Sequence, residues 1–142
     1  MKRISLLCLA LLLSALVLGG CGGIKFSFDI TKVGNKVTVK VNDIGDGETT
    51  ETDYVSIGKG RSVFVESQLE KGQLQIDIAE ATVYTHADPD QSDDIYVGDV
   101  VESITVGPGD TAQVSLKKGD YVYQLKTIGQ TSGKVVLDVK KE

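Results

Sequence analysis

Residues 24–41 read IKFSFDITKVGNKVTVKV, and this stretch decides the fold class. On both sides of Gly34 and Asn35, apolar side chains recur at every second position, which is the period of a half-buried strand. A two-residue turn at the glycine and asparagine places Ile30 opposite Val39 on one face. Turn and alternation agree on one register, so we predict an antiparallel β-hairpin here.

The rest of the chain has the composition of a β protein. Residues 21–142 contain 26 Val and Ile but only nine Leu and Ala. Short alternating runs are separated by glycine-containing turns, and no helical periodicity follows the amino-terminal segment. We therefore predict a single antiparallel all-β sandwich over residues 24–142, Greek-key, immunoglobulin-like or jelly-roll-like, with about 8 to 10 short strands.

Two details of strand pairing are also predicted. The alternation of the segment that starts at Leu74 reverses its phase at residues 79–81, which indicates a bulge or a strand that changes sheets. Near the carboxyl terminus, a five-residue loop at 129–133 would form a final hairpin. In that hairpin Leu125 lies opposite Leu137.

The amino terminus has the pattern of an export signal. Lys2 and Arg3 precede an apolar stretch at residues 6–18, which is too short for a permanent transmembrane helix. The stretch ends in Leu18-Gly19-Gly20-Cys21, which resembles the lipobox of bacterial lipoproteins. The resemblance implies that residues 1–20 are a cleaved signal peptide and that Cys21 carries diacylglycerol, often with a further acyl group such as palmitate on its new amino terminus.

This resemblance also implies a location. A lipidated Cys21 would hold the chain on the outer side of a cell membrane or on an outer membrane, in an extracytoplasmic position, with residues 21–23 as a short tether. Gly22 stands where an aspartate would signal retention at the inner membrane. Cys8 leaves with the signal, so the mature chain has no second cysteine for a disulfide.

A second resemblance lies near the carboxyl terminus. The run Lys118-Gly119-Asp120-Tyr121-Val122-Tyr123 resembles the opening of the penultimate strand in bacterial immunoglobulin-like and pre-peptidase C-terminal domains. In those families the tyrosine that corresponds to Tyr121 can form a corner hydrogen bond. The resemblance implies a binding or spacer module and names no ligand.

The sequence offers little for catalysis, so we expect no enzyme and no catalytic residue. His86 is the only histidine, and the chain lacks G-x-S-x-G, P-loop and H-E-x-x-H motifs. His86 itself is most simply a surface residue at the end of a strand. The chain carries 15 basic and 20 acidic side chains without a basic stripe, which excludes a nucleic-acid-binding class.

One acidic segment is chemically suggestive. Asp88, Asp90, Asp93 and Asp94 lie within seven residues, and carboxylate oxygens are the ligands that Ca²⁺ prefers. The alternative is a solvated loop that keeps the domain soluble. The spacing does not match an EF-hand, so both interpretations stay open at this point.

Tyrosines flank this acidic segment. Tyr84 and Tyr96 would form a sugar-stacking platform in a glycan-binding module, or would pack their rings on the sheet with the hydroxyl in water.

The sequence therefore predicts a lipid-anchored, extracytoplasmic protein of the cell envelope that acts as a non-catalytic binding or structural module. One alternative is a calcium-dependent or glycan-binding module that uses residues 88–94. Another is an accessory subunit of a membrane-proximal protein complex, which the short tether favours.

Overall fold

The computed structural model describes residues 27–142, so the predicted signal peptide and Cys21 lie outside the described residues. Within this range every regular element is a strand, and all eight strands belong to one antiparallel network. No helix in the described range is long and apolar enough to cross a membrane. The strands are β1 (Ser27–Val33), β2 (Lys36–Ile44), β3 (Thr49–Glu51), β4 (Val55–Ile57), β5 (Arg61–Tyr84), β6 (Asp94–Val106), β7 (Thr111–Ser115) and β8 (Gly119–Lys141). The predicted all-β class is confirmed.

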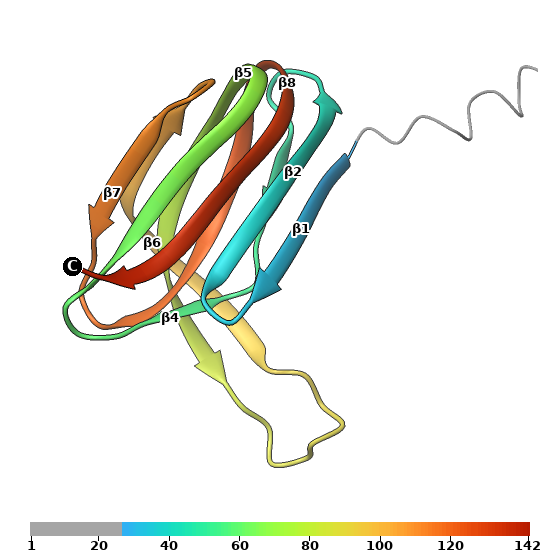
Figure 1. Ribbon diagram of the computed structural model, residues 1–142. Coiled ribbons are helices and arrows are strands. Elements are labelled where there is room, and N and C mark those ends of the chain that lie inside the picture. Colours follow the sequence, from blue (N-terminus) through green and yellow to red (C-terminus); the bar gives the residue numbers. More distant parts are fainter. Residues whose placement is uncertain (1–26) are drawn as a thin grey trace, which may run out of the picture.

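Two long strands fold this network into two layers (Figure 1). β5 has 24 residues and β8 has 23, and they pair from Arg61 opposite Lys141 to Ala81 opposite Asp120. The first half of β5 has β7 on its other side and the second half has β6. The late half of β8 pairs with β2, and its early half pairs with β3 and β4. The β5–β8 pair therefore runs through both layers of the sandwich.

β5 and β8 bend where they pass from one layer to the other, and glycines make this bend possible. Gly72 of β5 has φ 73° and Gly133 of β8 has φ 129°, in the region that L side chains rarely adopt. A Cβ on Gly72 would lie 2.4 Å from the Thr131 hydroxyl oxygen, and a Cβ on Gly133 would lie 2.5 Å from the Leu69 Cα. The β5–β8 register shifts twice between Leu69 and Gln73. The chain thus changes layers at Gly72, not at residues 79–81.

The predicted final hairpin is wrong. Leu125 lies opposite Ile76 of β5, and Leu137 lies opposite Val65 of the same strand. Residues 129–133 do not reverse the chain but lie inside β8, at the bend. Alternation sets which face a side chain occupies, but it does not set the partner strand, and two long partners satisfy it as well as a hairpin does.

The predicted first hairpin is confirmed as far as the described residues reach. Ile30 lies opposite Val39, and Val33 opposite Lys36 closes the two-residue turn, in which Gly34 has φ 61°. β2 then pairs with β8, so the hairpin joins the layer that also holds β7.

The core lies between the layers and consists largely of β-branched side chains. Its buried aliphatic members include Val37, Val39, Val41, Val55, Ile57, Val63, Val65, Leu69, Leu74, Ile76, Ile78, Val106, Leu125, Val135 and Leu137. Tyr121 forms the predicted corner bond, because its hydroxyl donates to the Lys117 carbonyl over 2.8 Å. The neighbouring aromatic residue Tyr123 is fully buried in the core.

Candidate functional site

A two-stranded arm projects from the sandwich at the end opposite the bend (Figure 1). The pairing of β5 with β8 stops at Ala81, and from there to Tyr84 only β6 pairs with β5. We call residues 81–101 the arm: the end of β5, the connecting loop 85–93 and the first part of β6. An isolated two-stranded ribbon is marginally stable, so the strand pairing within the arm adds little to the stability of the fold.

Bulges lie at the base of the arm. Between Ile78 and Ala81 of β5, the pairing with β6 shifts twice. The partner positions move from Glu102 to Val97, which leaves two extra residues on β6. The consecutive residues Ile78 and Ala79 are both fully buried although they lie on opposite faces of β5. The predicted phase reversal at residues 79–81 is therefore a change of the apolar face, and the bulge itself lies on β6, because β5 keeps its register with β8.

One face of the arm is aliphatic. The pairs Ala81 with Val97 and Val83 with Ile95 place four apolar side chains on the same side of the ribbon. Ile95 is 36% exposed and Val97 is 40% exposed, although neither carries a polar group. Ala81 and Val83 lie on the face of β5 opposite to the core residue Ile78, because β5 keeps a regular register with β8 up to Ala81. The aliphatic face is therefore on the outer side of its layer and stays partly exposed.

The other face of the arm carries the two predicted tyrosines. Tyr96 lies opposite Thr82, and Tyr84 lies opposite Asp94, so both rings are on the same side. Their centroids are 5.4 Å apart and their planes make an angle of 87°. Tyr84 is 58% exposed and Tyr96 60%. The structure brings them together edge to face, so they do not form one flat platform.

The exposure of β6 in this arm was not predicted from the sequence. Every residue from Asp94 to Ser103 is exposed. Val100 and Val101 are 48% and 41% exposed. The available signal was the run IYVGDVV, in which apolar residues do not alternate with polar ones.

The first two residues of the predicted calcium site belong to a local turn. The Asp88 carboxylate accepts from the Asp90 amide over 3.0 Å, and the Asp88 carbonyl accepts from the Gln91 amide over 3.1 Å. Pro89 occupies the second position of this turn, where its fixed φ is favourable.

The other two carboxylates point to different partners. Asp93 accepts a hydrogen bond of 3.2 Å from the Tyr54 hydroxyl, and Asp94 lies 2.9 Å from Nε2 of His86. The structure therefore does not bring the four predicted ligands together. In the range 27–142, no group of three or more His, Cys, Asp or Glu side chains is placed to hold a metal ion.

The Tyr54 contact ties the arm loop to the sandwich. The Lys32 ammonium lies 4.7 Å from the centroid of the Tyr54 ring and also donates to the Tyr54 carbonyl. The hydrogen bond to Asp93 and the charge of its carboxylate raise the pKa of Tyr54 above its ordinary value. The tyrosine is a neutral donor at physiological pH, and the raised pKa extends that state to more alkaline pH.

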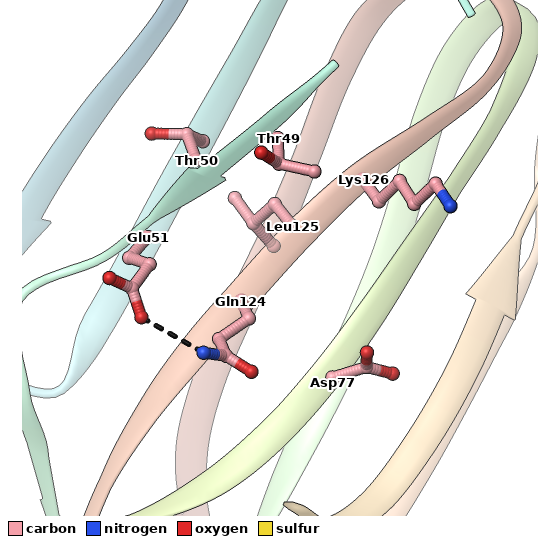
Figure 2. Close-up of a pocket in the computed structure, with 7 residues that line it drawn as sticks. All are labelled: Thr49, Thr50, Glu51, Asp77, Gln124, Leu125 and Lys126. Carbon is pink, nitrogen blue, oxygen red and sulfur yellow. Dashed lines mark hydrogen bonds between the residues drawn. The ribbon is translucent and has the colours of Figure 1, made fainter. Parts of the chain in front are cut away.

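The sandwich also carries an open hollow of about 560 Å³ on its outer surface, across β3, β8 and β5 (Figure 2). Glu51, Gln124 and Asp77 occupy one cross-strand row there. Gln124 donates to Glu51 over 3.0 Å, and Ser103 donates to Asp77. These polar groups hydrogen-bond to one another, which is typical of a solvated sheet face.

The chain matches no protein-family model, no curated protein and no solved structure.

Proposed function

We propose that this chain is an exported, lipid-anchored envelope protein that acts as a non-catalytic binding module and contacts its partner through the arm. One observation carries the binding role: the arm exposes apolar side chains on both faces of a ribbon that adds little to the core. Exposed apolar surface of this kind marks interaction sites in soluble domains. The anchor rests on the lipobox resemblance at Cys21.

The positions of the start of β1 and of the arm support this proposal. β1 starts at the bend. Ser27 lies opposite Asn42, and Ile44, two residues further along β2, lies opposite Thr131 in the bend of β8. The arm leaves from the other end, and the thirteen residues from Gly72 to Tyr84 span about 40 Å at the rise of a strand. An anchor at Cys21 would hold the bend near the membrane and the arm away from it.

The anchor is tested by fractionation and mass spectrometry of the chain expressed in a bacterium. We expect the mature protein in membranes, with residues 1–20 removed and the mass of a diacylglycerol group added at Cys21. Cys21→Ser is expected to abolish both, whereas the control Cys8→Ser retains both, because Cys8 lies inside the signal. A soluble, unmodified mature chain would contradict the anchor.

The binding role is tested by photocrosslinking in cells of the native host. A photoreactive residue is placed at Tyr96 or at Val97, whose side chains lie on opposite faces of one strand. A partner that contacts both faces of the arm is expected to give the same discrete adduct from both positions. The control position is Glu48, which is exposed and lies near the bend. Adducts of equal yield from Glu48, or none from the arm, would contradict the proposal.

A further inference from the structure

We propose that the arm binds an extended polypeptide segment with alternating basic and apolar side chains, which adds as a strand to the outer edge of β6. This inference rests on the proposed function, because it names the chemistry of the partner that the arm contacts. Three independent features of the described residues carry it: a free strand edge, two chemically different faces and a charge of one sign.

The first feature is the free edge. β6 is the last strand of its layer, and within residues 27–142 it pairs with β5 alone. Its outer backbone groups from Asp94 to Val101 are therefore open to a further strand. A peptide that adds to such an edge gains main-chain hydrogen bonds, and pockets for alternate side chains give specificity.

The second feature is the difference between the faces. A strand next to β6 would direct every second side chain to the aliphatic face, beside Ile95 and Val97. Valine or isoleucine suits that side. The other side chains would lie beside Tyr96 and Asp94, where lysine or arginine finds an aromatic ring and a carboxylate. A complementary partner strand would therefore have apolar and basic side chains at alternate positions.

The third feature is charge. Residues 80–102 carry seven acidic side chains and no lysine or arginine. A basic segment is attracted to this field, whereas a second copy that pairs β6 with β6 would bring like charges together. Charge complementarity therefore favours a basic polypeptide over self-association.

The test uses the chain without residues 1–21, which keeps all eight strands. The probe is a labelled, end-capped nine-residue peptide with alternating Lys and Val, and binding is followed by fluorescence anisotropy. Three control peptides isolate the three features. An analogue N-methylated at alternate residues cannot pair its backbone, five Lys followed by four Val keeps the composition without alternation, and alternating Glu and Val reverses the charge.

We expect the alternating Lys-Val peptide to bind at least about tenfold more tightly than each control, with affinity that falls as salt rises. Bound peptide should slow amide hydrogen exchange along β6. Equal binding of the N-methylated or block peptide would overturn strand addition in favour of simple ionic attraction. No binding would overturn the inference but leave the crosslinking test of the proposed function unaffected.

Paired variants add a gain-of-function test. In the double variant Asp99→Lys with Glu102→Lys, we expect the Lys-Val peptide to lose affinity and the Glu-Val peptide to gain it. The matched control, Glu48→Lys with Glu70→Lys, makes the same charge change at exposed positions near the bend and should leave the peptide preference unchanged. An equal effect of both double variants would overturn the assignment to β6. Sedimentation of the free chain as a dimer would overturn it in favour of a second copy.

Discussion

Gly133 of β8 lies against the backbone of Leu69 in β5 so closely that a Cβ on Gly133 would be 2.5 Å from the Leu69 Cα. This contact lies where the two long strands leave one layer and enter the other. The sandwich therefore depends on a close approach of two backbones at the bend, in addition to the burial of apolar side chains between the layers.

The bend predicts the effect of adding a single methyl group. Gly133→Ala should lower the free energy of unfolding by about 3 kcal/mol, because it combines an unfavourable φ with a backbone clash. Gly109→Ala is the matched control, since Gly109 also has a positive φ, 77°, but open space around it. It should cost about 1 kcal/mol. Urea denaturation measures both, and equal losses would contradict a role for the close contact.

Two neighbouring tyrosines should respond in opposite directions to loss of the hydroxyl. The buried Tyr123 hydroxyl has no hydrogen-bond partner within residues 27–142, so Tyr123→Phe should raise stability by about 1 kcal/mol. Tyr121→Phe removes the bond to the Lys117 carbonyl and should lower it by about 1 kcal/mol. Thermal melting compares the two variants. A loss of stability in Tyr123→Phe would mean that the hydroxyl is satisfied.

Tyr123 also makes stability depend on alkaline pH. Burial raises the pKa of Tyr123 far above its ordinary value of 10.0. A raised pKa in the folded state means that the folded chain holds its proton more strongly, so stability falls as pH increases above about 10. Tyr123→Phe should flatten this fall, as measured by urea denaturation between about pH 9 and 11. An unchanged slope would assign the alkaline sensitivity to other groups.

The bond between Tyr54 and Asp93 should govern the mobility of the arm loop. Tyr54→Phe removes the donor, so we expect faster amide hydrogen exchange in residues 85–93 with a change in global stability below about 1 kcal/mol. Asp93→Asn should lower the pKa of Tyr54 toward its ordinary value, because the carboxylate is the main cause of the shift. The control Tyr84→Phe, which keeps its ring beside Tyr96, should leave exchange in the loop unchanged.

Calcium should have little effect on this fold. The carboxylates of Asp88, Asp93 and Asp94 have separate hydrogen-bond partners, so binding one ion would require the loop to rearrange. We expect the same melting temperature in EDTA and in millimolar Ca²⁺. A site saturated to a hundred times its dissociation constant would add about 2.7 kcal/mol, so a clear rise would restore the calcium site predicted from the sequence.

Local features of the fold were predictable from the sequence where neighbouring residues determine them. The turn at Gly34 fixes the register of β1 and β2 because two residues leave one way to pair the flanking strands. The reversal of the apolar alternation at residues 79–81 was visible in the sequence, but the extra residues of the bulge are on β6, whereas β5 pairs regularly with β8 there. The corner bond of Tyr121 also spans only four residues, but it was expected from the family resemblance at residues 118–123.

The candidate site was predicted only in part for the same reason. Tyr84 and Tyr96 were singled out and do lie together, but the exposure of Ile95 and Val97 depends on which face of their layer packs on the core. An apolar residue in a strand has the same sequence pattern whether a second layer covers it or not.

The sequence by itself determined that this chain forms strands, which side chains of the first hairpin share a face and where its turn lies, because these follow from the period of two and from glycine at a positive φ. Only the tertiary structure decided that Leu125 pairs with Ile76 and not with Leu137, since the alternation of apolar side chains does not determine the partner strand. It also decided that the carboxylates of the arm loop stay apart and that the arm extends past the core. Both depend on where β8 stops pairing with β5, a contact between residues far apart in the chain.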